Sequence, residues 1–170
     1  IKVIEGGVTA PKGFSAASTA AEIKYKGRED MAMVYSKAPA VSAGTFTTNV
    51  VKAAPVIWDR DVVVKGGSAR AIVVNSGIAN ACTGKQGMDV CEQTAKAAGE
   101  VLGIPADSVL VASTGVIGIR LPLEKMIKHV PELTSSLSSD EQSAHNSELA
   151  MMTTDTVPKE VSATITLNNG

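Results

Sequence analysis

The order of hydrophobic and polar residues predicts strands separated by short turns over much of the chain. Residues 69–75 form a largely apolar run that stops at Asn75-Ser76-Gly77, which is typical of a buried strand. Residues 108–112 form a second such run and stop at Ser113-Thr114-Gly115. Further extended segments are predicted at 30–35, before a Lys37-Ala38-Pro39 turn, at 43–49, at 61–64 and at 160–167.

Three other segments have helical spacing. Between residues 89 and 102, Val90, Ala95 and Ala98 can share one face, and Gly103 can end the helix. Residues 122–130, with Pro122 in the first turn, and residues 141–152 are the other two predicted helices. Because apolar strands alternate with helices, the sequence predicts an α/β fold, with α+β as the alternative, in which helices cover a mixed sheet. A length of 170 residues suits a single domain, 1–170.

The last predicted strand runs directly into Asn168-Asn169-Gly170, a hairpin-type turn. A turn of this type is normally followed by another strand. We therefore expect either that the fold ends on an edge strand, or that a partner strand lies on another polypeptide or beyond residue 170.

Composition narrows the function classes. The 16 Lys and Arg residues nearly balance the 17 Asp and Glu residues, so the net charge is −1 and offers no general attraction for nucleic acid or anionic membranes. Aromatic residues make up only 3% of the chain, which disfavours base-stacking platforms. With 44% hydrophobic residues the chain can bury a substantial core, so disorder throughout is excluded.

The cysteine and histidine residues predict no metal site. The small number of cysteines also favours a cytoplasmic location. Cys82 and Cys91 are too few for a disulfide scaffold or a four-thiolate zinc site, and we interpret them as reduced thiols. His129 and His145 lie in no recognisable site loop, so structural roles are favoured for both. No segment reads as a membrane span or a signal peptide.

Candidate chemistry lies in glycine-containing loops after the predicted strands, because phosphate-loop, dinucleotide-loop, zinc-helix and nucleophile-elbow motifs are absent from the sequence. In the loop of residues 112–118, a glycine N–H and a neighbouring hydroxyl could form an oxyanion hole at a strand end. An ordinary strand-to-loop turn is the alternative. Residues 75–84 form a second loop of this kind.

A third polar loop follows the last predicted helix. It contains Thr153, Thr154, Asp155 and Lys159, which could bind a small charged substrate. The alternative is that Thr154 or Asp155 only caps or turns the end of the helix.

Five segments together carry a family resemblance. They are Gly6-Gly7-Val8-Thr9-Ala10-Pro11-Lys12-Gly13-Phe14, Ala43-Gly44-Thr45-Phe46-Thr47-Thr48-Asn49, residues 75–84, residues 112–118 and residues 153–159. Their order closely resembles the ornithine acetyltransferase family, also called the glutamate N-acetyltransferase family, over essentially the whole chain. Two positions depart from the family pattern: Ile78, where Asn is usual, and Glu22, where Gly is common.

The resemblance implies a self-processing precursor. Family members cut themselves before a threonine, which becomes the N-terminal nucleophile of the β chain, and the upstream piece is the α chain. This sequence resembles the α chain without the end that precedes the cleavage site. Its fold is then an N-terminal-nucleophile architecture that the β chain completes, and the expected assembly is α2β2.

The resemblance also implies a reaction. Ping-pong transfer moves the acetyl group from N-acetylornithine to glutamate in arginine biosynthesis, with no resident cofactor and with acetyl-CoA as a second donor in bifunctional members. Thr114 and Gly115 match the oxyanion hole, and Thr154 matches a substrate-binding position. The alternatives are a self-processing amidase or aminopeptidase, which would use water as acceptor, and a non-catalytic binding subunit.

Overall fold

The computed structural model describes residues 1–66 and 68–168. The strands are β1 (Lys2–Ile4), β2 (Phe14–Thr19), β3 (Met31–Val41), β4 (Ser68–Asn75), β5 (Val109–Ser113) and β6 (Ser162–Thr164). The α-helices are α1 (Ala54–Val64), α2 (Gly84–Leu102), α3 (Leu123–Ser135) and α4 (Glu141–Met151), with short 3-10 turns at Gly7–Thr9 and Ala106–Ser108. None of these helices has the length and apolar character needed to cross a bilayer.

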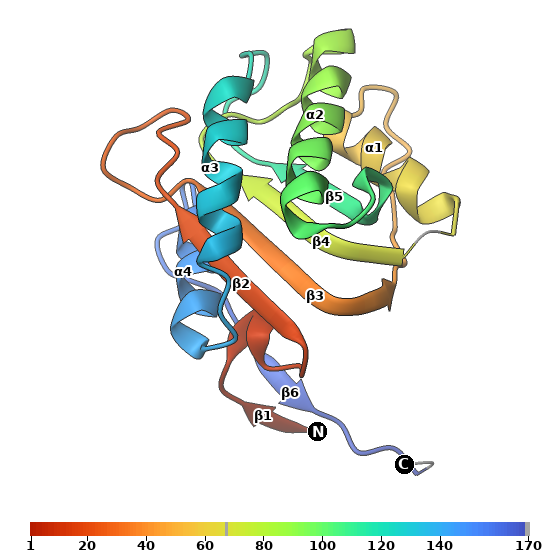
Figure 1. Ribbon diagram of the computed structural model, residues 1–170, viewed down its shortest axis with the longest axis vertical. Helices are drawn as coiled ribbons and strands as arrows, with labels where there is room; N and C mark the ends of the chain where they lie inside the picture. The colour runs from red at the N-terminus through yellow and green to blue at the C-terminus, as the bar shows by residue number, and fades with distance from the viewer. Residues whose placement is uncertain (67, 169–170) are drawn as a thin grey trace.

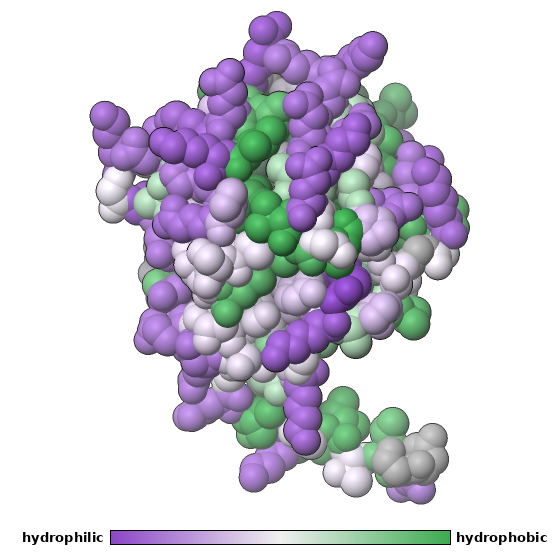
Figure 2. Space-filling model, in the orientation of Figure 1, coloured by the Kyte–Doolittle hydropathy of each residue, from purple (hydrophilic) through white to green (hydrophobic). Residues whose placement is uncertain are grey.

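The main sheet has the order β2-β3-β4-β5, and its strands confirm the predicted mixed α/β fold. β2 with β3 and β3 with β4 are antiparallel, whereas β4 and β5 are parallel. α2 and α3 cover one face (Figure 1), over a core that contains Met33, Val73, Val109, Val130 and Leu133. An apolar band between these two helices is visible on the surface in Figure 2.

α4 covers the opposite face of the sheet and lies behind β2 in Figure 1. Val34 of β3 borders a cavity together with Ala144 and Ser147 of α4. The Ser147 hydroxyl also donates a hydrogen bond to the Ala17 carbonyl of β2 (3.3 Å). The sheet is therefore sandwiched between helices, as expected from strands that are apolar on both sides.

Most predicted elements are present, with shifted ends. The strands predicted at 69–75 and 108–112 are β4 and β5, and the one at 30–35 begins β3. α2 starts at Gly84, before the predicted residue 89, and ends at Leu102. The C-cap residue Gly103 has a φ of +66°, a left-handed conformation that favours glycine. α3 continues through Pro131 to Ser135, and the helix predicted at 141–152 is α4.

The strand predicted at 61–64 is wrong, because these residues form the last turn of α1. Pro55 stands in the first turn of that helix, where its fixed φ favours helix initiation. The valines then continue the helix, and Val62 is buried. Packing of α1 against the sheet therefore overrides the strand preference of three consecutive valines.

Two further predictions need correction. The turn predicted at Lys37–Pro39 lies within β3, whose pairing with β4 shifts register between Tyr35 and Ala40. Arg70 holds this irregular stretch with hydrogen bonds to the Ser36 and Lys37 carbonyls. Residues 43–49 form no strand and belong to neither of the sheets that the described residues form.

The strand predicted at 160–167 is reduced to β6, and its partner lies in this chain. β6 pairs antiparallel with β1, with Lys2 opposite Thr164. In this two-stranded sheet β6 has β1 on one side and no other paired strand among the described residues, which agrees with the alternative of a terminal edge strand. The ribbon projects below the sheet in Figure 1, and the turn predicted at 168–170 lies partly outside the described residues.

α1 protects the free edge of β5, which ends the main sheet. Trp58 Nε1 donates to the Val109 carbonyl (2.9 Å), and Asp59 Oδ1 accepts from the Val111 N–H (3.0 Å). These bonds occupy backbone groups that would otherwise be open to another strand. Burial raises the pKa of Asp59 to about 6, against the opposing effect of the Val111 hydrogen bond.

The raised pKa of Asp59 predicts a pH-dependent cost of folding. Between about pH 4 and 6 the folded protein binds the proton that the unfolded chain has released, so the contribution of Asp59 to stability falls as pH rises. Asp59→Asn keeps the acceptor for Val111 but cannot ionise. We expect this variant to be more stable than the original protein at pH 7 and equally stable at pH 4, measured by urea denaturation. An unchanged difference across that range would contradict the assignment.

Candidate functional site

A cavity of about 340 Å³ opens where the carboxyl ends of the parallel strands β4 and β5 meet. Strand ends, the segment after α4 and the loop before β3 supply its walls, which consist of Lys24, Tyr25, Arg28, Gly77, Thr114, Gly115, Val116, Met152, Thr153 and Thr154. The predicted site residues Thr114, Gly115 and Thr154 therefore line one cavity, together with Thr153.

Asn75 joins the ends of the two strands. Its side chain is fully buried. Nδ2 donates to the Ile78 carbonyl (2.9 Å), and Oδ1 accepts from the Ser113 hydroxyl (2.6 Å). Its main-chain carbonyl accepts from the Thr114 N–H (3.0 Å). One buried amide therefore fixes the start of both loops, in a setting where each unpaired polar group would be costly.

The two loops then continue side by side. The Val116 N–H donates to the Gly77 carbonyl (3.2 Å), and the Ala79 N–H donates to the Val116 carbonyl (3.0 Å). Gly115 sits at this crossing with a φ of +131°, and a Cβ added to it would lie 2.3 Å from the Gly77 carbonyl carbon. Only glycine fits, because the atoms that a side chain would meet are backbone atoms.

Two hydrogen-bond donors at this crossing remain open. Among the described residues, neither the Thr114 hydroxyl nor the Gly115 N–H has a hydrogen-bond partner. Thr114 is half-buried and Gly115 is exposed, and both line the cavity. A neutral hydroxyl and a backbone amide on a rigid turn can stabilise a developing oxyanion without reorganisation.

Two hydrogen bonds hold the end of α4 beside the cavity. The Ser76 hydroxyl donates to the Ala150 carbonyl (2.6 Å), and Arg28 Nη2 donates to the Met152 carbonyl (2.5 Å). These bonds hold the residues after the helix beside the Thr114 loop. They connect three segments that are far apart in sequence.

Thr154 does not cap α4. The C-cap residue is Met152, whose N–H donates to the Glu148 and Leu149 carbonyls. Thr154 is exposed and makes no hydrogen bond within the described residues, whereas Asp155 accepts from the Thr153 N–H (3.5 Å). Asp155, and not Thr154, therefore organises the turn after the helix. The Thr154 hydroxyl is available to a ligand.

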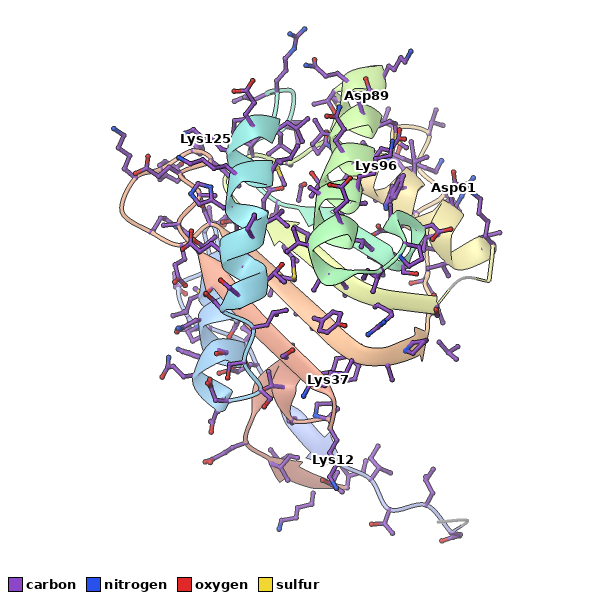
Figure 3. All side chains as sticks on the ribbon, viewed as in Figure 1. Lys12, Lys37, Asp61, Asp89, Lys96 and Lys125 are labelled. Carbon is purple, nitrogen blue, oxygen red and sulfur yellow. The ribbon has the colours of Figure 1, made fainter. Side chains whose placement is uncertain are left out.

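The loop of residues 20–30 forms the remaining wall and depends on Asp30. This carboxylate is buried and accepts from the Ala21 N–H (2.9 Å) and the Ile23 N–H (2.6 Å). The Asp30 carbonyl also accepts from the Ser76 N–H (2.9 Å). Lys125, labelled on α3 in Figure 3, donates to the Glu22 carbonyl.

The sequence interpretation missed the charged residues of this wall. Lys24 and Arg28 stand in a polar segment without periodicity, so no pattern predicts that it folds over the cavity. The one available signal is Glu22, which stands where glycine is common in the family. Its φ of +53° lies in the left-handed region that favours glycine, which indicates a tight turn here.

Other candidate groups lie away from this cavity. Burial, followed by the charge of Asp59, raises the pKa of Cys91 to about 12, which makes this thiol a poor nucleophile. His145, Glu148 and Glu160 place one ligand atom each within 4.8 Å of the others and could hold a cation. None of these four residues lines the cavity.

The fold and the loops define a class: a mixed α/β chain with a cavity at the carboxyl ends of two parallel strands. The model of the ArgJ family matches residues 15–170, and the chain belongs to this family. It is 42% identical to ornithine acetyltransferase from Mycobacterium tuberculosis, a structure in complex with ornithine, with a TM-score of 0.89 over 94% of this chain and 86% of that one.

Further relatives agree with this assignment. The arginine biosynthesis bifunctional protein ArgJ of Bacillus halodurans has a TM-score of 0.85 and 38% identity, over 92% of this chain and 82% of that one. Proteins of the same name from Gloeobacter violaceus and Thermotoga neapolitana are 47% and 48% identical over 92% of this chain. The chain spans 38% and 39% of the length of these last two relatives.

The crossing of the two loops predicts different costs for two glycine substitutions. Gly115→Ala adds a Cβ that overlaps the Gly77 backbone, so we expect a loss of about 3 kcal/mol in the free energy of unfolding. Gly118→Ala is the matched control, because its φ is also positive (+77°) but nothing lies within 4 Å of the added Cβ. That change should cost only about 1 kcal/mol. Equal losses in chemical denaturation would show that the crossing is not tight.

Proposed function

We propose that the protein of which this chain is part transfers the acetyl group from N-acetylornithine to glutamate by a ping-pong mechanism. The observation that carries the proposal is the cavity at the ends of β4 and β5, which combines two open donors with a polar segment suited to a small amino-acid substrate. The names of the relatives, an ornithine acetyltransferase and arginine biosynthesis proteins, support the same reaction.

In this mechanism Thr114 and Gly115 form the oxyanion hole. The nucleophile is the N-terminal threonine of a β chain, activated by its own α-amino group, which accepts the hydroxyl proton. Attack on the acetyl carbonyl gives a tetrahedral oxyanion that accepts hydrogen bonds from the Thr114 hydroxyl and the Gly115 N–H. Collapse breaks the amide bond, returns the proton to the leaving nitrogen and releases ornithine.

Glutamate then enters the same cavity. Its amine attacks the acetyl ester of the β-chain threonine, the oxyanion forms again at the same donors, and N-acetylglutamate leaves as the threonine hydroxyl recovers its proton. Thr154 binds the substrate in both half-reactions. The chain needs no resident cofactor for these steps, and acetyl-CoA is a further donor only if the protein is bifunctional.

We also propose how the two chains of this protein form and assemble. The two chains arise from one precursor by self-cleavage and associate as α2β2. The free thiols of Cys82 and Cys91 suit the reducing cytoplasm as the compartment of this assembly.

The reaction is tested by incubating the purified two-chain protein with N-acetylornithine, with and without glutamate. Ornithine release that depends on glutamate supports the transferase. Release without glutamate would indicate an amidase, and the absence of any turnover would indicate a binding subunit.

Thr114→Ala removes one oxyanion donor. We expect kcat to fall by ~10²–10³, about 2.7–4 kcal/mol in the transition state. Thr114→Ser keeps the hydroxyl and should retain much of the rate. Steady-state kinetics of the two variants make the comparison, and equal rates would show that the hydroxyl donates no hydrogen bond to the oxyanion.

Thr154→Val removes a hydroxyl that has no partner within the described residues. We expect the KM for N-acetylornithine to rise roughly tenfold, about 1.4 kcal/mol, while kcat stays near its original value. The melting temperature should not change, because α4 ends without help from Thr154. Unchanged kinetics with a lower melting temperature would assign Thr154 a structural role.

A further inference from the structure

The candidate cavity carries an uneven distribution of charge. Of the described residues that line it, Lys24 and Arg28 are cationic and none carries a carboxylate. The nearby acid Asp155 is already paired with the Lys159 ammonium (2.5 Å). The cavity therefore presents two positive charges to whatever it binds, although the whole chain is close to neutral.

Lys24 is held beside the oxyanion-hole loop. Its stem lies against Gly77, since a Cβ added to Gly77 would come within 2.9 Å of the Lys24 Cβ. Gly77 in turn contacts Gly115 through the backbone. The preceding residue, Ile23, is buried and bonded to Asp30, so the backbone that leads into Lys24 is fixed.

The ammonium of Lys24 has no anionic partner in the described part of the chain. Its Nζ lies 4.7 Å from the centroid of the exposed Tyr25 ring, and no salt bridge involves it. Arg28, by contrast, already uses its guanidinium to hold the Met152 carbonyl. Lys24 is thus the cation of this wall that is available to a ligand.

The two substrates of the proposed reaction differ in net charge. N-acetylornithine carries one carboxylate and one ammonium, and its product ornithine is a net cation. Glutamate carries two carboxylates and one ammonium, so it is a net anion. A cationic wall near the acetylated nucleophile repels ornithine and attracts glutamate, which favours the forward exchange of one for the other.

We infer that Lys24 is a specificity-determining residue that binds a carboxylate of the acceptor glutamate. This inference rests on the proposed acetyl transfer and adds to it the residue that selects an acidic acceptor. Because a ping-pong reaction separates the half-reactions, kcat/KM for glutamate reports only on glutamate and the acetyl-enzyme, and kcat/KM for N-acetylornithine only on the donor.

The test uses the active two-chain protein and three substitutions. Lys24→Gln removes the charge, Lys24→Arg keeps it, and Lys26→Gln removes an exposed charge from the same loop outside the cavity. For Lys24→Gln we expect kcat/KM for glutamate to fall about tenfold through KM, with kcat/KM for N-acetylornithine within about threefold of the original. Lys24→Arg should recover most of the loss, and Lys26→Gln should match the original protein.

Salt dependence gives a second measurement. Higher ionic strength should raise the KM for glutamate in the original protein and in Lys26→Gln, and should affect Lys24→Gln much less. Equal KM values for glutamate in Lys24→Gln and Lys26→Gln would overturn the inference. So would parallel losses for donor and acceptor, because these indicate a general structural role.

Failure of the inference is distinguishable from failure of the proposed function. If the original protein releases ornithine only when glutamate is present and Lys24→Gln behaves like the original, acetyl transfer stands and the role of Lys24 is refuted. If the original protein shows no glutamate-dependent release, the proposed function itself is refuted, and the inference with it.

Discussion

The candidate site depends on the close approach of two backbones, at Gly77 and Gly115, beyond the ends of β4 and β5. The parallel pairing of these strands places Asn75 beside Ser113, and the buried Asn75 amide bonds to Ile78 after β4 and to Ser113 at the end of β5. This geometry requires glycine at 115, because any side chain there would overlap the Gly77 backbone. The approach thereby fixes an exposed Gly115 N–H and the Thr114 hydroxyl on one rigid crossing.

The other walls of the cavity are attached to this crossing by buried polar contacts. Ser76 is central, because its N–H bonds to the Asp30 carbonyl and its hydroxyl bonds to the Ala150 carbonyl. The loop that carries Lys24 and the segment that carries Thr154 are therefore both tied to the residue after Asn75. Such contacts are short and directional, so they can hold loops in place where apolar packing is sparse.

The sequence predicted the parts of the site that lie on strongly patterned elements. The apolar runs before Asn75 and Ser113 located β4 and β5, and the polar residues after them located the loop of residues 112–118, in which the resemblance singled out Thr114 and Gly115. The resemblance to the ornithine acetyltransferase family supplied the proposed reaction, which no hydrophobic or polar pattern indicates. The loop after α4 was predicted because it follows a well-defined helix, and the family resemblance singled out Thr154 within it.

The remainder could not be predicted, for physical reasons. Residues 61–64 have the composition of a strand, but Pro55 and the docking of α1 on β5 make them helical. The cationic wall stands on a loop whose conformation is set by the buried Asp30, a long-range contact that leaves no periodic signal. The pairing of β1 with β6 likewise joins two short segments from opposite ends of the chain.

A crystal structure of the proposed two-chain protein with a boronate adduct on the proposed nucleophilic threonine would test the site most directly, because the tetrahedral boronate mimics the tetrahedral intermediate of acetyl transfer. The quantity to measure is the distance from the boronate oxygen to Thr114 Oγ1 and to the Gly115 nitrogen. We expect both distances to be about 2.7–3.1 Å. A boronate oxygen more than about 3.5 Å from both atoms would lie beyond hydrogen-bond reach and would contradict the oxyanion hole.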